Sequence, residues 1–332
     1  MRIFVTGGSG FVGAAAIRRL RSDGHDVLAL ARGGASADRM RRLGAEPVLG
    51  DLEQLPESSP GWLRALDGCD AVVHAAAYME FWGPDRLFVE RNLRPTVALH
   101  AAAVRAGVPR FVLVSAASVS SGTQRAAVVS ERSDNGRPNL AYSRVKLATE
   151  QALLTVRSQT TQLVILRPPY VWGVGMKTLE EMVKVVRAGR FAWIDHGRHT
   201  MDFIHVENLA HAIALALDHG TPDGVYYVSD GHPMPIREFF TALFATQGVT
   251  PPTRSIPRQI ATGVATIMDL AYKTARRPVA PPLTRWLVAF MGRDRSYDIS
   301  AARHDLGYQA ITSHQDGLET LRAHDVEHAA IA

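Results

Sequence analysis

Two side chains near the middle of the chain have the types and the spacing for acid–base chemistry. Tyr142 and Lys146 lie four residues apart, and on a helix this spacing puts both on one face, about one turn apart. A nearby ammonium group stabilises a phenolate, so we expect the pKa of the phenol to fall from about 10 toward neutral pH. Such a phenol can donate or accept a proton in a reaction. Pairs of this kind are common on solvated helix surfaces. Whether this pair is catalytic therefore depends on the motifs in the rest of the chain.

A glycine-rich segment at the N-terminus supplies the second chemical feature. Residues 3–5 predict a short apolar strand, glycines follow at positions 7, 8, 10 and 13, and residues 14–20 predict a helix. In this order, a Gly-x-Gly-x-x-Gly spacing indicates a dinucleotide site. The glycines allow a tight turn, and the N-terminus of the helix offers free N–H groups and a positive dipole to a pyrophosphate. The segment Gly7–Gly13 therefore predicts a cofactor site, with an ordinary tight turn as the alternative.

The composition is that of a protein with a full hydrophobic core. The chain has 332 residues, of which 46% are hydrophobic and 21% charged, enough for one large or two modest domains. The only cysteine, Cys69, excludes an intrachain disulfide and suits a reducing compartment. We see neither a signal peptide nor an apolar stretch of roughly 18 residues, and we expect a cytoplasmic protein without a membrane span. The net charge of +5 comes from scattered basic residues, which argues against a nucleic-acid partner.

Strand and helix patterns alternate through the first half of the chain. The predicted strands are residues 3–5, 26–31, 46–49, 71–74, 111–114 and 163–166, with helices between them at 14–20, 35–43, about 85–106 and around Tyr142. This alternation predicts an α/β fold with a Rossmann-type doubly wound parallel sheet in residues 1–168. Residues 169–332 are expected to form a smaller, mostly helical substrate-binding domain, with parts of 190–230 returning to the sheet. Ligands bind at the carboxyl ends of such strands.

One helical segment of the second half carries an apolar stripe. Ile260, Val264, Ile267, Met268 and Ala271 share one side of the helix predicted within residues 257–275. We favour a helix that covers the core or a substrate pocket. The alternative is a peripheral contact of residues 257–275 with a membrane surface.

These and further motifs resemble the extended short-chain dehydrogenase/reductase family over nearly the whole chain. The motifs are Thr6–Gly13, Gly50–Leu52, Val73–Ala77, Asn92, Tyr142 with Lys146, Arg167–Gly173 and Asp202–Ala210. The C-terminal half looks most like the branch of the 3β-hydroxysteroid dehydrogenases and 2-alkyl-3-oxoalkanoate reductases, through residues 227–231, 282–285 and 302–308. The resemblance implies an NAD(P)-dependent oxidoreductase that acts on a C=O or CH–OH group.

The resemblance also implies roles for individual residues. Tyr142 would be the general acid that protonates the carbonyl oxygen, and Lys146 would lower its pKa and hold the nicotinamide ribose. Asp51 and Leu52 would contact the adenine. The residues expected to line the cofactor site, besides Tyr142 and Lys146, are Gly7, Ser9, Gly10, Phe11, Val12, Gly13, Arg32, Asp51, Leu52, Ala75, Ala76, Ala77, Ser115, Pro168 and Val171.

One position departs from the pattern of the family. The family has a Ser or Thr after the fifth strand that bonds the substrate oxygen, and the alignment puts Ala116 there. The loss of one donor to a developing oxyanion costs roughly 3 kcal/mol. We expect Ser118, rather than Ser115, to act as the third catalytic residue. The alternatives are a substrate that supplies its own hydroxyl, or an altered activity.

The end of the second predicted strand indicates which cofactor is used. An acidic side chain there would bind the ribose hydroxyls of NAD, but the strand ends without one and is followed by Arg32. A guanidinium group suits a 2′-phosphate. We therefore favour NADP(H) over NAD(H).

Aromatic and apolar residues after two of the strands indicate a small hydrophobic substrate, such as a steroid-like compound, a β-keto acid or an aromatic ketone. The candidates are Met79, Phe81, Trp82, Tyr170 and Trp172, and core packing is the alternative for each. Two other functions stay open: a nucleotide-sugar epimerase or dehydratase that retains NAD, and a non-catalytic NADP-binding sensor. The histidines have no metal-ligand spacing, and we expect no metal. A homodimer is possible.

Overall fold

The computed structural model describes most of the chain. The described residues are 1–55, 57, 59–80, 82–122, 128–133, 135–138, 140–156, 158–275, 277 and 279–331, with the backbone alone for 325–331.

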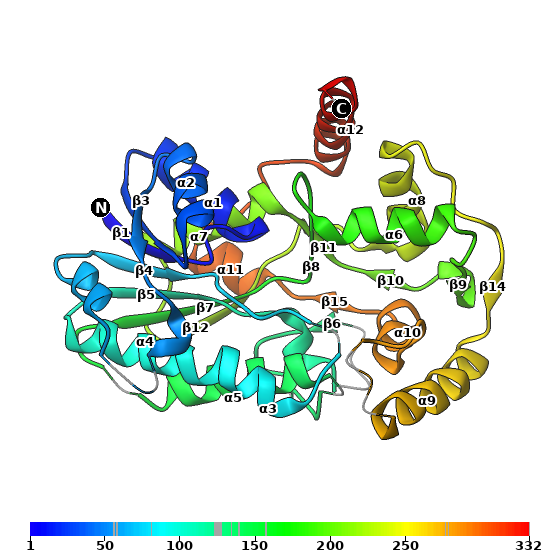
Figure 1. Cartoon of the computed structure of the whole chain (residues 1–332), viewed down its shortest axis with the longest axis horizontal. Coiled ribbons are helices and arrows are strands. Elements are labelled where there is room, and N and C mark those ends of the chain that lie inside the picture. Colours follow the sequence, from blue (N-terminus) through cyan, green and yellow to red (C-terminus); the bar gives the residue numbers. More distant parts are fainter. Residues whose placement is uncertain are drawn as a thin grey trace.

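A seven-stranded parallel sheet forms the centre of the first lobe (Figure 1). The strands lie in the order β12-β7-β5-β4-β1-β2-β3. Their bounds are β1 Arg2–Thr6, β2 Asp26–Ala31, β3 Glu46–Leu49, β4 Ala71–His74, β5 Arg110–Val114, β7 Gln162–Arg167 and β12 Gly224–Tyr227. The Rossmann-type doubly wound sheet is thus confirmed, and each predicted strand agrees with the structure to within one residue at either end.

The strands are continuous apolar runs because helices cover both faces of the sheet. In β1, Ile3 and Val5 pack on the side of α1, whereas Phe4 points to the other side and stacks on Trp62 with ring centroids 6.0 Å apart. Successive side chains of a strand point to opposite faces, so only a strand covered on both faces needs every residue to be apolar.

The helices form two layers around this sheet (Figure 1). One layer contains α1 (Phe11–Ser22), α2 (Gly34–Arg42), α7 (Val206–Asp218) and α11 (Ser300–Asp305). The other contains α4 (Arg94–Arg105) and α5 (Ala141–Leu154). The long helix predicted at 85–106 is α3 (Asp85–Phe88), a π turn at Val89–Leu93, and α4. The chain leaves the sheet after β7 and returns to it with α7 and β12.

The second lobe is mostly helical and occupies the right-hand side of Figure 1. Its helices are α6 (Lys177–Arg187), α8 (Ile236–Thr246), α9 (Arg258–Thr274) and α10 (Arg285–Met291), and α12 (His314–Ile331) packs on α8. The short strand pairs are β8 (Tyr170–Trp172) with β11 (Phe203–His205), β9 (Trp193–Ile194) with β14 (Ser255–Ile256), β10 (Thr200–Met201) with β13 (Met234–Pro235), and β6 (Val128–Val129) with β15 (Ser296–Tyr297). None of the helices in the described ranges is long and apolar enough to cross a bilayer.

The prediction that the stripe on α9 covers a core was wrong. Ile260, Val264 and Ile267 are exposed, and the face that packs against the lobe is formed by Ala261 and Ala265. The small alanines let α9 approach the lobe closely, and the larger apolar side chains are left on the outer side.

Candidate active site

The glycine-rich turn after β1 is packed so tightly that side chains do not fit. Gly7 has a φ of +76°, and a Cβ there would lie 2.5 Å from the backbone nitrogen of Ala76. A Cβ on Gly13 would lie 2.2 Å from the carbonyl oxygen of Gly7. Ser9 and Gly10 are exposed, and α1 begins at Phe11 with Gly10 as its N-cap. The turn therefore presents open backbone at a helix N-terminus, which fits a dinucleotide pyrophosphate.

Buried hydrogen bonds fix the turn to the neighbouring strand. The Thr6 hydroxyl lies 2.7 Å from Nδ1 of His74, and Nε2 of His74 lies 2.8 Å from the Thr96 hydroxyl on α4. Burial, assisted by the nearby ammonium of Lys146, lowers the pKa of His74 to about 3. The histidine is therefore neutral and joins the ends of β1 and β4 to α4, which aligns Ala75–Ala77 with the glycine turn.

The loop after β4 is held by an asparagine in the π turn. Oδ1 of Asn92 accepts the backbone N–H of Tyr78 at 2.7 Å, and its amide nitrogen donates to the Tyr78 carbonyl at 2.9 Å. Tyr78 packs beside Phe88 and Tyr142 in one apolar cluster. A π turn changes the side-chain direction locally and is frequent at functional sites. Here it lets a buried amide fix the loop that lies beside the catalytic candidate.

Tyr142 and Lys146 are both buried on the inner face of α5. Nζ of Lys146 lies 5.9 Å from the centroid of the Tyr142 ring and donates to the Val114 carbonyl at 3.0 Å. Burial lowers the pKa of Lys146 to about 8, opposed by the carboxylate of Glu150. Burial also raises the pKa of Tyr142 well above its usual range. The expected lowering of the phenol pKa is therefore wrong for this structure, because the ammonium faces β5 and the phenol is desolvated.

The two serines after β5 have different surroundings. The Ser115 hydroxyl is buried and donates to the carboxylate of Glu150, so it serves the structure. Ser118 is half-buried, and its Oγ accepts a hydrogen bond from Ser143 on α5 at 2.8 Å. Among the described residues, Ser118 has no acceptor for its own hydroxyl hydrogen. Ser118 is thus the serine whose hydroxyl can still donate.

Ala116 lies in the apolar cluster of Tyr142, together with Tyr78 and Leu140. The position that the family pattern gives to a hydroxyl donor is therefore beside the phenol, and here it is apolar. A substrate oxygen next to Tyr142 therefore has to accept its second hydrogen bond from a residue other than Ala116.

A buried ion pair below the site could not be found from the sequence. The guanidinium of Arg167 contacts the carboxylate of Glu150 at 2.6 Å, and Nη1 of Arg167 donates to the Tyr227 hydroxyl at 3.2 Å. The Tyr227 hydroxyl donates in turn to Ser120 at 2.9 Å. These partners are far apart in sequence and follow no spacing rule. The network fixes the carboxyl ends of β5, β7 and β12 relative to α5.

The residues expected at the adenosine end lie at the ends of β2 and β3. Arg32 is exposed and follows β2 directly. It precedes the N-terminus of α2, whose N-cap is Gly33. Asp51 accepts the backbone N–H of Glu53 at 3.0 Å, and Leu52 is half-buried. A cation beside a helix N-terminus at this edge fits a phosphate group.

The candidates near the nicotinamide end are partly structural. The Pro168 carbonyl accepts the backbone N–H of Ala117 at 2.8 Å, and Val171 is half-buried against the hydrophobic core on the α1 side of the sheet. Trp172 is fully buried, and its indole N–H donates to Asp230 at 3.1 Å. The prediction that Trp172 contacts a substrate was wrong, because β8 directs this side chain into the core of the second lobe.

The other substrate candidates differ in exposure. Tyr170 contacts the rings of Phe203 and Phe240, and burial raises its pKa to about 12. Met79 is 55% exposed. The half-buried Trp82 donates from its indole nitrogen to the carbonyl of Arg277 at 3.3 Å. Phe81 lies outside the described residues. Within the described part of the chain, no group of His, Cys, Asp and Glu could hold a metal ion.

Comparisons with known proteins agree with this geometry. The model of the NAD dependent epimerase/dehydratase family matches residues 3–229. A 4-hydroxy-2-methyl-3-oxo-4-farnesyl-3,4-dihydroquinoline-1-oxide ketoreductase of Stigmatella aurantiaca is 33% identical, with 97% of this chain and 96% of the relative covered. A 2-alkyl-3-oxoalkanoate reductase of Stenotrophomonas maltophilia (strain K279a) is 31% identical, with 97% and 99% covered. The crystal structure of gox2253 shares the fold, with a TM-score of 0.77, 24% identity and 98% of both chains covered.

Proposed function

The chain belongs to the NAD dependent epimerase/dehydratase family and is an oxidoreductase within it, and from this premise we propose that it reduces a ketone group on an apolar small molecule with NADPH. The observation that carries the proposal is the position of Tyr142, which is buried on the face of α5 that also carries Lys146 and lies beside Ala116, just after β5. The phenol keeps its proton at neutral pH, because burial raises its pKa further above the usual value. A ketone that receives a hydride needs a proton on its oxygen, and a protonated phenol in the site can supply it.

The remaining residues orient the groups that react. A bound nicotinamide dinucleotide would supply the hydride, and the glycine turn before α1 would hold its pyrophosphate. Lys146 would contact the nicotinamide ribose after its ammonium leaves the Val114 carbonyl, to which it now donates at 3.0 Å. Ser118 would donate its free hydroxyl hydrogen to the same substrate oxygen as Tyr142.

Two observations support NADPH as the cofactor. The segment after β2 has Arg32 and the N-terminus of α2 at the place where a ribose-binding acid would accept from NAD. A guanidinium group and helix N–H groups both bind a 2′-phosphate.

The names of the two relatives support an apolar ketone substrate. One is named for a farnesyl-substituted quinoline oxide and the other for 2-alkyl-3-oxoalkanoates, and both names are those of reductases. Met79, Trp82 and Tyr170 lie on segments that follow β4 and β7, where apolar side chains can contact such a chain.

The experiment that tests this function is an NADPH oxidation screen. Purified protein is mixed with NADPH and, separately, steroid ketones, 2-alkyl-3-oxo acids and alkylated aromatic ketones, and the loss of absorbance of NADPH is followed. We expect turnover with at least one long-chain ketone and little with short ones. No turnover with any ketone, together with NAD that copurifies and resists exchange, would instead favour an epimerase.

A further inference from the structure

The outer side of α9 is an apolar surface that no described part of the chain covers. Ile260, Val264, Ile267 and Leu270 are 60%, 44%, 71% and 64% exposed. They follow one another at intervals of three and four residues and therefore lie along one side of the helix. We call this set the α9 outer face. Four large apolar side chains exposed side by side on one helix are unusual on a protein that has only water as its neighbour.

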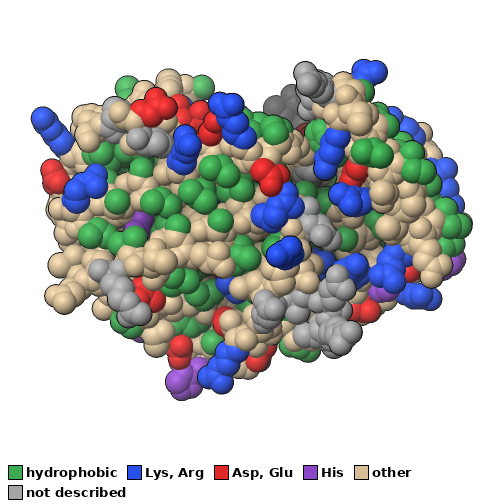
Figure 2. Space-filling model, turned by 90° about the horizontal axis from the view of Figure 1, so that it is seen from below, with side chains coloured by type: hydrophobic (Ala, Val, Ile, Leu, Met, Phe, Trp, Pro, Cys, Tyr) green, Lys and Arg blue, Asp and Glu red, His purple; other side chains and the backbone are tan. Residues whose placement is uncertain are grey.

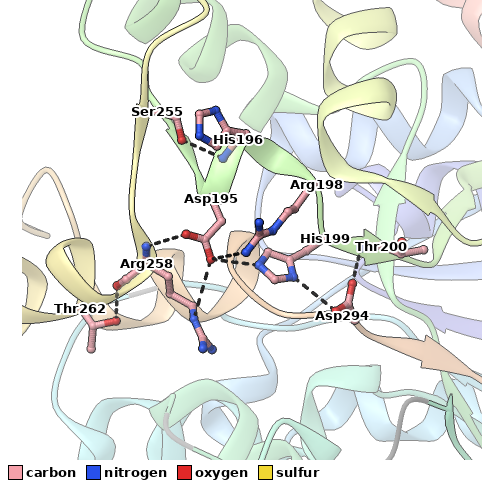
Figure 3. Close-up of polar contacts among 9 residues, drawn as sticks. All are labelled: Asp195, His196, Arg198, His199, Thr200, Ser255, Arg258, Thr262 and Asp294. Atoms are coloured by element: carbon pink, nitrogen blue, oxygen red, sulfur yellow. Dashed lines mark hydrogen bonds and ion pairs between the residues drawn. The ribbon is translucent and has the colours of Figure 1, made fainter.

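Two polar contacts, one near each end, hold α9 in this orientation. At its start, the backbone N–H of Arg258 donates to Asp195 at 2.8 Å, and Figure 3 shows that carboxylate at the centre of a group that also includes His199. On the inner side, the carboxylate of Asp269 pairs with Arg285 at 3.2 Å. These contacts fix the rotation of α9 about its axis, so the outer face stays directed away from the lobe.

Basic residues outnumber acidic ones in the segment that contains α9, and the carboxylate of Asp195 lies at the start of the helix. Residues 254–295 contain eight Lys or Arg and only two acidic residues, Asp269 and Asp294. Asp269 is buried and paired with Arg285, and Asp294 bonds His199 and Thr200 in the group of Figure 3. Figure 2 views this side of the molecule and shows Lys and Arg side chains spread over the second lobe, with fewer acidic ones among them. An apolar stripe within a cationic surround complements an anionic lipid surface.

An aromatic contact connects α9 with the candidate active site. The Trp82 ring lies edge-on to Tyr272 at 6.4 Å, and Nζ of Lys273 lies 5.7 Å from the centroid of the Trp82 ring. Trp82 is four residues after Tyr78, which packs in the cluster of Tyr142. Tryptophan, tyrosine and lysine at one end of an apolar stripe are the side chains that favour the boundary between headgroups and acyl chains.

We propose that the α9 outer face docks on the surface of an anionic lipid bilayer. The helix lies in the plane of the headgroups with its four apolar side chains in the acyl region, and the basic residues around it contact the lipid phosphates. The loop with Met79 and Trp82 then meets the lipid, so that an apolar ketone can pass from the bilayer toward Tyr142. This last step rests on the proposed function, whereas the docking itself does not.

The test is flotation of the purified full chain with phospholipid vesicles. We expect the protein to float with vesicles of phosphatidylcholine and phosphatidylglycerol, and to float much less with phosphatidylcholine alone or at high salt. The double variant Ile267→Glu, Leu270→Glu should reduce binding by roughly tenfold or more, because it places two charges in the acyl region. Ile311→Glu is the matched control, since Ile311 is 55% exposed on a loop away from α9, and it should bind as the unmodified protein does.

Three results would overturn docking: no flotation of the unmodified protein, equal losses in the double variant and the control, or a concentration-dependent dimer that only the double variant abolishes. The last result would mean that a second copy covers the face. Binding is measured without ketone or NADPH, and the double variant should keep its turnover of a ketone dissolved in water. Failure of the reductase function therefore shows in the oxidation screen, and failure of docking in flotation.

Discussion

The protonation state of one buried phenol sets the chemistry expected at the residue scale. Tyr142 is desolvated by Phe88, Val145 and the residues after β5, and its proton is held more tightly than in water. The spacing of Tyr142 and Lys146 could be predicted from the sequence because both lie on one helix. The direction of the pKa change could not, because it depends on burial and on the carbonyl of Val114 that binds the ammonium.

The first prediction separates the roles of this pair. Tyr142→Phe should leave NADPH affinity nearly unchanged and lower turnover roughly 100-fold or more, because it removes only the proton donor. Lys146→Ala should weaken NADPH binding as well. Fluorescence titration of NADPH and steady-state kinetics measure the two effects. Full turnover in Tyr142→Phe would contradict the mechanism.

The second prediction concerns Ser118, which we propose as the donor in place of the one missing at Ala116. Ser118→Ala should lower turnover roughly tenfold or more. Ser143→Ala should lower it less, because Ser143 only orients Ser118 through their 2.8 Å hydrogen bond, and Ser143→Thr should restore part of the loss. Ala116→Ser should preserve or raise turnover. Kinetics with one accepted ketone decide the matter, and unchanged turnover in Ser118→Ala with a large gain in Ala116→Ser would leave Tyr142 as the sole donor.

The third prediction concerns the choice of cofactor. The exposed guanidinium of Arg32 should make NADPH bind at least several-fold more tightly than NADH. Arg32→Asp should invert this order, because a carboxylate repels the 2′-phosphate and accepts from ribose hydroxyls. Affinities of both cofactors for both proteins provide the measurement. Equal affinities in the unmodified protein would remove the role given to Arg32.

At the scale of elements, the sequence predicts those strands and helices whose hydrophobic residues follow a local pattern. The strands of the large sheet were found because burial on both faces requires uninterrupted apolar runs, as in Phe111–Val114. The two-residue strands β6, β9, β13, β14 and β15 are too short to show any period. For α9 the apolar stripe was visible, but its period is the same whether the stripe faces a core or faces outward. Only the packing of Ala261 and Ala265 decides which side is buried.

The fourth prediction concerns the turn between β1 and α1. Gly13→Ala puts a Cβ 2.2 Å from the Gly7 carbonyl, so the turn has to move and NADPH affinity should fall at least tenfold. The stabilisation by NADPH in a thermal melt should fall with it. Gly263→Ala is the control, because it adds a methyl group to α9 with no atom within 4 Å. It should leave cofactor binding unchanged, and an equal loss in both variants would mean that the effect is not local.

At the scale of the whole molecule, buried carboxylates join the two lobes. Asp230 accepts from the indole of Trp172 at 3.1 Å and from the side chain of Asn208 at 2.6 Å. Asp202, before β11, accepts the backbone N–H of Tyr297 in β15 at 2.7 Å. Both acids belong to motifs that were recognised from the family resemblance, but their function as links between lobes depends on contacts across about 20 to 100 residues of sequence. Sequence spacing cannot predict such contacts.

The fifth prediction follows from the buried state of Asp202. Burial raises its pKa from 3.8 to about 6, and the nearby Asp230 adds to the rise. Below about pH 4, Asp202 is protonated in both the folded and the unfolded chain, so its titration does not change the free energy of unfolding. Between pH 4 and 6 the unfolded chain ionises first, so the free energy of unfolding falls as pH rises, by about 3 kcal/mol in total at 1.36 kcal/mol per pKa unit. Above pH 6 this contribution is constant.

Asp202→Asn should remove this dependence. Measured by urea unfolding from pH 4 to 7, the stability of the variant relative to the unmodified protein should rise through the window and then level off. Asp298→Asn provides a control of opposite sign: hydrogen bonds from Ser300 lower the pKa of Asp298, so this side chain stabilises the fold at higher pH and loses that contribution as pH falls. Parallel pH profiles for Asp202→Asn and the unmodified protein would mean that the pKa of Asp202 is the same in the folded and unfolded chain, which would contradict the prediction. A difference that keeps growing up to pH 7 would mean that Asp202 stays neutral in the fold at neutral pH.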